Sequence, residues 1–347
     1  MQRTLPGLHW IGTGSLHKGS YMETITREQS IRKINELAGK EIPFVFLINF
    51  SGEENIVMTP EKAAATGFFL DMPGMANHIF EKNPGPGIQL TKMPPDPKRY
   101  HQAFKHAIEQ IHYGNSFLLN LTFPTPIECN YSLKDIFIQS RASFKLYLED
   151  ELVVFSPERF INIKGNTLSS NPMKGTIDAS IPGAHSMLAS DPKEDAEHNT
   201  IVDLIRNDLS MVASHVRVKR FKYIEKLKTH QGELLQMSSE ITGKLPVNFR
   251  KSLGDILFRL LPAGSICCAP KKKTLEIIQE VEVYERGFYT GIFGYFDGQN
   301  LDSAVAIRYI EKQGKKLLFK SGGGITYMSD WEKEYDEMQK KVYVPVY

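Results

Sequence analysis

Hydrophobic and polar residues follow two different periods along this chain, and the two periods predict two kinds of element. Residues 43–50 (PFVFLINF) are a continuous apolar run bounded by turn-forming residues, which is typical of a buried strand. Residues 194–212 instead place apolar side chains three and four positions apart, which predicts a helix with one buried face. The chain therefore combines strands with helices.

The same periods predict the remaining elements. We expect strands at 117–123, 144–148, 152–155, 233–243, 289–296, 302–310 and 315–321. We expect helices at 100–113, 249–260, 272–284 and 330–342. Because the strands cluster instead of alternating strictly with helices, their order favours an α+β fold. A connector rich in Pro and Gly, 83–97, follows an N-terminal segment (1–96) that we treat as part of the same globule as the main body (97–347).

Composition argues against several classes of protein. The 347 residues include 42 basic and 40 acidic side chains that are mixed along the chain, so we expect no nucleic-acid-binding surface. No apolar stretch is long enough for a signal-peptide core or a membrane span. Cys129, Cys267 and Cys268 form neither a disulfide framework nor a CxxC metal pair, which predicts reduced thiols in a cytoplasmic protein.

Candidate chemistry gathers near the C-terminus. The glycine run in SGGGIT (321–326) follows a predicted strand, and its N–H groups either hold an anion or belong to a simple tight turn. The helix predicted next places Glu334, Glu337 and Lys341 on one face. A solvated charged face is the ordinary interpretation of such a run.

Two further residues carry chemistry of interest. Glu197 opens a second helix, where an acid is often only a partner of the helix dipole. Oxygen ligands from two separate helices would suit Mg²⁺, which takes few carboxylates and keeps several waters. Lys174 stands between Pro172 and Gly175 in a predicted turn, where a lysine ordinarily faces solvent. No GxSxG elbow is present, so a serine hydrolase of that type is not indicated.

Nine segments, in this order, resemble the chorismate-utilising enzyme family. They are GNSFLLNLT (114–122), FSPERF (155–160), NPMKGTI (171–177), EHNTIVDLIRNDL (197–209), LPAGSICCAPK (261–271), RGFYTGIFGY (286–295), DSAVAIR (302–308), SGGGI (321–325) and EKEYDE (332–337). The resemblance implies an α+β fold in which two β-sheets pack face to face with helices outside. It also implies that 97–347 is a catalytic core that binds chorismate.

The same resemblance assigns roles to individual residues. Glu197 and Glu334 would hold Mg²⁺, with Glu337 beside them, and the ion would bind the ring carboxylate of chorismate. The residues assigned to substrate binding are Arg308, Lys341, Ser265, Tyr289 and the N–H groups of Gly322, Gly323 and Gly324. A dianionic substrate does need such fixed donors and cations.

Two positions distinguish the members of the family. Isochorismate and salicylate synthases carry a water-activating lysine where this chain has Leu118. Lys174 stands where anthranilate synthases carry a small residue, and a lysine there resembles aminodeoxychorismate synthase component I, an enzyme of folate synthesis. This implies that Lys174 attacks ring carbon 2 and expels the 4-hydroxyl, after which ammonia adds at carbon 4. Glu158 resembles the general acid that protonates the departing hydroxyl.

Departures from the family pattern leave alternatives open. Gln236 replaces a histidine, Cys268 replaces a glycine, and Ser265 replaces a threonine. Gln236 and Cys268 would suit a non-catalytic chorismate-binding subunit, and anthranilate synthase component I is the nearest alternative enzyme. No GxCxG nucleophile turn of a glutamine-hydrolysing domain is present. We therefore expect ammonia to come from solution or from a separate glutamine amidotransferase subunit, and the resemblance implies the latter.

Overall fold

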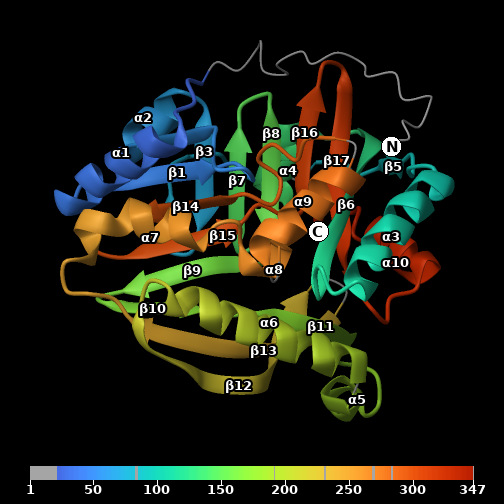
Figure 1. Cartoon of the computed structure of the whole chain (residues 1–347). Coiled ribbons are helices and arrows are strands. Elements are labelled where there is room, and N and C mark those ends of the chain that lie inside the picture. The colour runs from blue at the N-terminus through green and yellow to red at the C-terminus, as the bar shows by residue number, and fades with distance from the viewer. Residues whose placement is uncertain are drawn as a thin grey trace, which may run out of the picture.

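Two antiparallel β-sheets form the centre of the fold, and helices lie outside them (Figure 1). The computed structural model describes residues 22–82, 85–190, 192–229, 232–267, 270–282 and 284–346. The prediction of an α+β fold with two packed sheets is confirmed.

The first sheet contains 9 strands among the described residues. In spatial order they are β11 (Met173–Asp178), β13 (Gly232–Lys244), β10 (Thr167–Ser170), β9 (Arg159–Lys164), β15 (Leu301–Val305), β14 (Ile292–Phe296), β1 (Phe44–Ile48) and β2 (Asn55–Met58), and β12 (Ser214–Thr229) pairs with β13. The predicted strand 43–50 is thus β1, and all five of its residues are buried.

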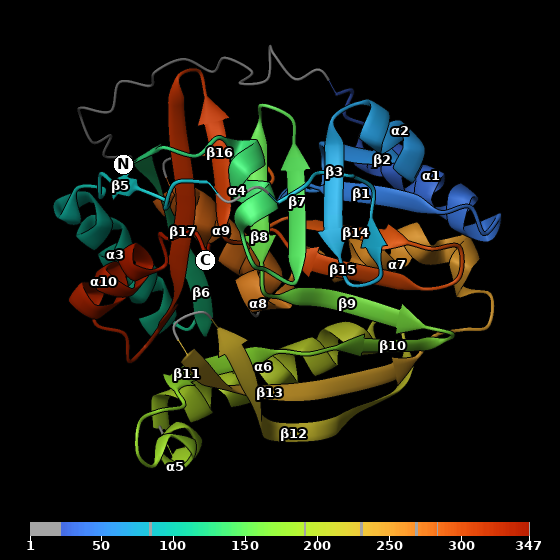
Figure 2. The same ribbon diagram turned by 180° about the vertical axis from the view of Figure 1, so that it is seen from behind.

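The second sheet contains 8 strands within the same described ranges. Their order is β4 (Met75–Ala76), β3 (Phe68–Met72), β7 (Phe144–Leu148), β8 (Leu152–Ser156), β16 (Tyr309–Gln313), β17 (Lys316–Thr326), β6 (Leu118–Cys129) and β5 (Leu90–Lys92). Figure 2 shows this sheet from the other side, with β17 beside β16 in the upper part of the molecule.

The two sheets bury a shared apolar core. Val45 and Leu47 of β1 pack with Leu70 of β3 and Leu146 of β7, and each of the four is fully buried. Each such side chain contributes about 1.5–3 kcal/mol when it leaves water. Residues of the N-terminal segment therefore contribute strands to both sheets.

Helices cover the outer faces of the sheets (Figure 1). The helical elements are α1 (Arg27–Gly39), α2 (Pro60–Ala65), α3 (Pro97–His112), α4 (Leu133–Gln139), α5 (Ala184–Ser190), α6 (Pro192–Ser210), η1 (Phe249–Ser252), α7 (Leu253–Leu260), α8 (Gly264–Cys267), α9 (Lys271–Val281) and α10 (Trp331–Lys340). The apolar face predicted for 194–212 is the buried face of α6, which packs on the first sheet through Ile201, Leu204, Ile205 and Leu209.

Four local predictions were wrong. Glu197 does not open its helix, because α6 begins at Pro192. The glycine run 321–326 is no turn, because it lies inside β17 and pairs with β6. Lys174 lies in β11 and not in a turn. The single strand predicted at 302–310 is two strands in different sheets, because Arg308 takes a left-handed conformation with φ of 55° just before β16.

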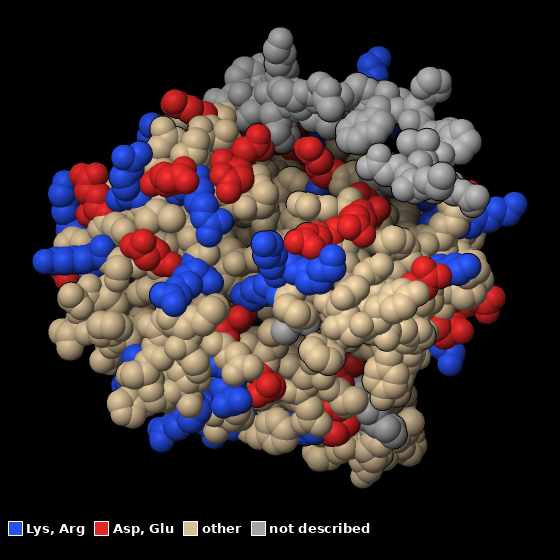
Figure 3. Space-filling view, viewed as in Figure 1, with Lys and Arg blue, Asp and Glu red and all other residues tan. Residues whose placement is uncertain are grey.

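Charge and hydropathy agree with the composition. Basic and acidic side chains are interspersed over the face drawn in Figure 3. Of the helices in the described ranges, none by itself is long and apolar enough to cross a membrane, although the bent pair Phe249–Cys267 with Lys271–Val281 meets that criterion together.

Candidate active site

Lys174 is held at the edge of the first sheet by an ion pair. Its Nζ lies 2.9 Å from Oε2 of Glu197 on α6, and the two side chains are 24% and 8% exposed. A β-bulge follows Lys174, since the register of β11 on β13 shifts between Lys174 and Thr176. The bulge uses Gly175, whose φ of 71° favours glycine and whose Cβ would lie 2.7 Å from Leu188. The bulge and the ion pair together fix the lysine.

Two consecutive glycines of β17 lie beside Lys174 on one face of the strand and beside Glu334 on the other. A Cβ on Gly324 would lie 3.8 Å from Nζ of Lys174, and one on Gly323 would lie 3.3 Å from Oε2 of Glu334. A Cβ at position 323 would be in tight contact with Glu334, and one at position 324 would be in tight contact with Leu118 and in ordinary contact with Lys174. The glycine run thus lets β11, α6 and α10 converge on one segment of backbone.

Glu334 is the most deeply buried carboxylate among the site residues predicted from the sequence. It is 2% exposed, and Ser329 donates a hydrogen bond to its Oε1 at 2.8 Å. Asp330 caps α10 by accepting from the N–H of Lys333 at 3.1 Å, which fixes where the helix begins. The cap therefore determines which side of α10 faces β17.

Lys341 joins the same helix to the glycine strand. Its Nζ lies 2.7 Å from Oε1 of Glu337 and donates to the carbonyl oxygen of Gly322 at 2.9 Å. Burial lowers the pKa of Lys341, as do the charges of Arg308 and Lys174, whereas Glu337 raises it. Lys341 is thus a cation held close to other cations, a situation that a bound anion would relieve.

The N–H groups of the glycine run do not all face one way. The N–H of Thr122, which lies opposite Gly322, donates to Glu282, and the Gly322 carbonyl accepts from Lys341. The backbone N–H and carbonyl groups of Thr122 and Gly322 therefore point away from the space between β6 and β17. Gly324, two residues on, faces the same way as Gly322, whereas the N–H of Gly323 points toward β6.

Glu158 lies between β8 and β9 in an environment that favours its neutral form. Ser265 of α8 donates a hydrogen bond to its Oε1 at 2.6 Å. Burial raises the pKa of Glu158 above the ordinary value, although Ser265 and the charges of Lys174, Arg308 and Lys341 act in the opposite direction. A carboxyl with a raised pKa is suited to donate a proton near neutral pH.

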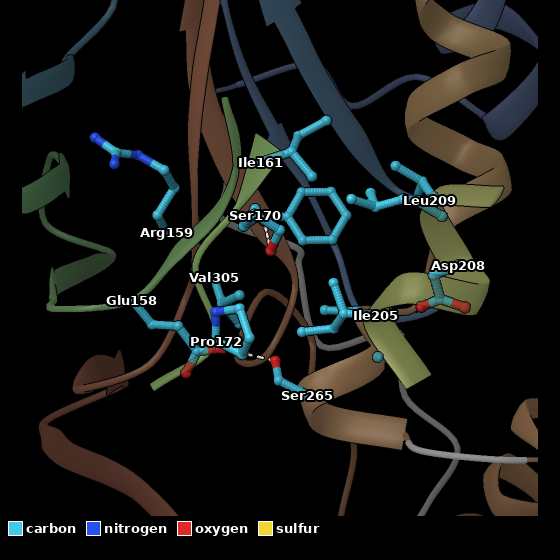
Figure 4. A pocket seen from close by; sticks show the side chains of 14 residues that line it. Glu158, Arg159, Ile161, Ser170, Pro172, Ile205, Asp208, Leu209, Ser265 and Val305 are labelled. Carbon is cyan, nitrogen blue, oxygen red and sulfur yellow. Dashed lines mark hydrogen bonds between the residues drawn. The ribbon is translucent and has the colours of Figure 1, made fainter. Parts of the chain in front are cut away.

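A small cavity adjoins Glu158 (Figure 4). Its volume of about 30 Å³ has room for roughly one or two waters. The cavity is lined by Glu158, Ser265, Ser170 and Asp208, together with apolar residues that include Ile205 and Leu209. This volume is far smaller than that of a typical ligand pocket, about 300–1,000 Å³.

Arg308 and Tyr289 complete the residues that were assigned to substrate binding. The Arg308 guanidinium lies over the ring of Tyr343, 5.7 Å from its centroid. Tyr289 is 3% exposed, and burial raises its pKa far enough to keep the phenol neutral. The charges of Arg308 and Glu158 also act on Tyr289, which places all three in one neighbourhood.

A buried ion pair that the sequence analysis missed supports the strand opposite the glycines. Arg286 lies 2.6 Å from Glu282, and both side chains are 2% exposed. Glu282 accepts from the N–H and the hydroxyl of Thr122, and Arg286 donates to the carbonyl of Asn120. Arg286 stands in a segment that resembles the family, but only the fold reveals its contacts.

Two of the three predicted metal ligands, Glu197 and Glu334, suit a hard divalent cation. Across the described ranges, no three His, Cys, Asp or Glu side chains converge as a metal site would require. Mg²⁺ needs only one or two carboxylates and keeps several waters. Glu197 and Glu334 are buried oxygen donors on two helices, and Lys174 shows that a cation is accommodated at Glu197. Glu337, half exposed and paired with Lys341, is less suited to be a ligand.

Three positions at which this chain differs from other members of the family are Leu118, Gln236 and Cys268. Leu118 is 2% exposed, and its Cδ1 lies 3.1 Å from the Cβ position of Gly324, so an apolar side chain borders the glycine strand. Gln236 lies on β13 opposite Thr176 of β11. Cys268 lies outside the described residues.

Comparison with known proteins identifies the family. Residues 35–346 match the family model of the chorismate binding enzymes. The chain is 49% identical over 325 residues to an uncharacterized PabA-like protein of Haemophilus influenzae, which covers 94% of this chain and 99% of the relative. The chain therefore belongs to the chorismate-binding enzyme family.

More distant relatives carry two different names. Anthranilate synthase component 1 of Lactococcus lactis is 34% identical over 59% of this chain and 46% of its own length. Aminodeoxychorismate synthase component 1 of Bacillus subtilis is 30% identical over 70% of this chain and 54% of its own length. These values do not separate the two activities.

Solved structures share the fold. The isochorismate synthase DhbC of Bacillus anthracis has a TM-score of 0.67 and 20% identity, covering 91% of this chain and 86% of its own. Anthranilate synthase component I of Streptococcus pneumoniae has a TM-score of 0.61 and 25% identity, covering 73% of this chain and 58% of its own.

Proposed function

We propose that this chain replaces the 4-hydroxyl of chorismate with ammonia and releases 4-amino-4-deoxychorismate. Chorismate as the substrate follows from the family. The position of Lys174 carries the choice of product, because an amine beside the Gly322–Gly324 backbone supplies a nucleophile at the substrate site.

The reaction consists of two displacements at the ring. Neutral Nζ of Lys174 forms a bond to carbon 2, both ring double bonds shift (C1=C2 to C1=C6 and C5=C6 to C4=C5), and the bond from carbon 4 to oxygen breaks. Glu158 gives its proton to the departing hydroxyl, which leaves as water. Ammonia then bonds to carbon 4, both double bonds shift back, the bond from carbon 2 to Nζ breaks, and the new ammonium group returns one proton to Glu158. Chorismate and ammonia become the amino product and water.

The protonation states that Lys174 and Glu158 need support their roles as nucleophile and general acid. Lysine is nucleophilic only when neutral, and its free pKa is about 10.4, so Nζ must lose a proton before attack. Glu158 must carry a proton, and burial favours that state. The charge of Lys174 lowers the pKa of Glu158, which supports assigning both groups to one site.

The remaining site residues suit the charges of the substrate. Arg308 and Lys341 are cations that act on Glu158, and Gly322 and Gly324 turn their N–H groups away from β6. We propose that these groups receive the two carboxylates of chorismate, with Ser265 and Tyr289 at the border of the site. Glu197 and Glu334 would hold Mg²⁺, which supplies a positive charge for the ring carboxylate.

We further propose that ammonia comes from a separate glutamine amidotransferase subunit. The nucleophile turn of such an enzyme is absent from the sequence. Isolated chain should therefore use ammonium salts but not glutamine.

Anthranilate synthesis is the second candidate, because relatives with that name are as similar as those named aminodeoxychorismate synthase. Pure protein should be incubated with chorismate, Mg²⁺ and ammonium, and the product identified by mass spectrometry. The proposal expects the amino product with its enolpyruvyl group intact. Fluorescent anthranilate with an equivalent of pyruvate would contradict it, and absence of any turnover would favour a non-catalytic chorismate-binding subunit.

A further inference from the structure

The contact between Ser265 and Glu158 changes the role that resemblance assigned to Ser265. The serine Oγ donates to Oε1 of Glu158 at 2.6 Å, so this hydroxyl proton is already engaged within the protein. Figure 4 shows the two side chains facing each other beside the cavity, with the second glutamate oxygen turned away from the serine. Ser265 therefore contacts the acid of the proposed reaction directly.

The backbone that carries Ser265 is itself held close to α6. Gly264 begins α8, and a Cβ on it would lie 2.6 Å from Oδ2 of Asp208. Asp208 pairs with Lys271 of α9 at 2.8 Å. Because α8 is packed between these residues, the serine hydroxyl has a defined position relative to Glu158.

Several charged and titratable groups surround Glu158. Lys174 acts on it from β11, Arg308 from the segment before β16, and Lys341 from the end of α10. Tyr289 interacts with it electrostatically, and Asp208 borders the same cavity from α6. None of these side chains makes the hydrogen bond to Oε1 that Ser265 makes.

Resting on the function proposed above, we propose that Ser265 is a positioning residue that holds Oε1 of Glu158 and leaves Oε2 as the oxygen that protonates the departing hydroxyl. A hydroxyl that donates to Oε1 disfavours a proton on that oxygen. The carboxyl proton then resides on Oε2. One side chain thus determines both the orientation of the acid and the oxygen that reacts.

The hydrogen bond has a second, measurable consequence. A donor stabilises the ionised carboxylate more than the neutral acid, so Ser265 lowers the pKa of Glu158 against the effect of burial. Removal of the hydroxyl should raise that pKa by about one unit, as expected for a hydrogen bond of about 1.5 kcal/mol to a charged group. Since the reaction needs protonated Glu158, the alkaline limb of the rate profile should shift upward.

The test compares three variants. Ser265→Ala removes the donor, Ser265→Thr keeps a hydroxyl, and Ser170→Ala is the matched control. Ser170 lines the same cavity, but its hydroxyl donates to the carbonyl of Phe160 and not to Glu158. We expect Ser265→Ala to lower kcat at least tenfold with little change in KM and to move the alkaline limb up by about one pH unit. The threonine variant and the control should keep the wild-type profile.

A direct titration separates this inference from the proposed function. The pKa of Glu158 can be followed by NMR in protein labelled with ¹³C at glutamate side chains, using Glu158→Gln to assign the signal. A higher pKa in Ser265→Ala than in wild type is expected even if the reaction proves to be a different one. An unchanged pKa, or a rise in KM with an unchanged rate profile, overturns the inference. If the alanine variant does not fold, Ser265→Cys, a weaker donor, should shift the pKa in the same direction.

Discussion

Lys174 on β11 and Glu197 on α6 form an ion pair of 2.9 Å, although the two residues lie 23 positions apart in the chain. The pair connects the proposed nucleophile with a proposed metal ligand. Together with the glycines of β17, it joins the first sheet to the end of the second.

Lys174→Ala should sharply lower amination at carbon 4, because the first displacement loses its nucleophile. Some activity should survive if ammonia attacks the ring directly. The rate of product formation should be measured with saturating ammonium, using Lys219→Ala as the control, since Lys219 is an exposed lysine paired with Glu240. Wild-type rates in Lys174→Ala would exclude the covalent role.

Glu158→Gln should lower kcat by about 10²–10⁴-fold, the usual contribution of a general acid. In the wild type, activity should fall as pH rises through the raised pKa of Glu158, because the ionised form cannot donate a proton. The rate profile between acid and alkaline pH tests this. Glu128→Gln, on the exposed side of β6, should leave the profile unchanged.

Glu158→Gln should also stabilise the fold at alkaline pH. The pKa of Glu158 is raised in the native state, so ionisation costs native stability once the pH exceeds the unfolded pKa of about 4.3. Glu158→Gln removes that cost, and its melting temperature should exceed that of the wild type at pH 8. The difference should shrink as the pH falls toward about 4; an equal difference at both pH values would contradict the account.

Activity should require Mg²⁺, and Glu197→Gln and Glu334→Gln should each raise the concentration needed for half-maximal rate. Both carboxylates are buried oxygen donors on separate helices. Glu337→Gln is the matched comparison on α10 and should have a smaller effect on the metal requirement, because Glu337 is half exposed and pairs with Lys341. Full activity after treatment with a chelator would refute the metal proposal.

Arg286→Met should destabilise the protein by about 3–5 kcal/mol, because it leaves the Glu282 carboxylate buried without its cation. Chemical denaturation measures this free energy of unfolding. The double variant with Glu282→Gln should recover part of the loss, since no uncompensated charge is then buried. A single variant as stable as the wild type would show that the pair contributes little to the fold.

Local sequence determined the elements whose pattern does not depend on distant residues. The apolar run 43–50 became β1, the helical spacing at 194–212 became α6, and residues 144–148 became β7 without change. In each case the burial of one face or of a whole segment follows from the order of apolar residues alone. The chemistry of Lys174, Glu158 and Glu197 was likewise indicated by resemblance before any contact was known.

Tertiary structure decided what local patterns cannot contain. The glycine run forms a turn or a strand according to whether a partner strand is available, and β6, which begins some 200 residues earlier, provides one. Ser265 meets Glu158 across a separation of 107 residues. The Glu282–Arg286 pair is buried against β6, where Glu282 accepts from the N–H of Thr122 and Arg286 donates to the carbonyl of Asn120. The residues next to Glu282 and Arg286 in the sequence do not predict these contacts. Spacing along the chain specifies which faces are apolar, whereas contacts between distant side chains exist only after the sheets have paired and packed.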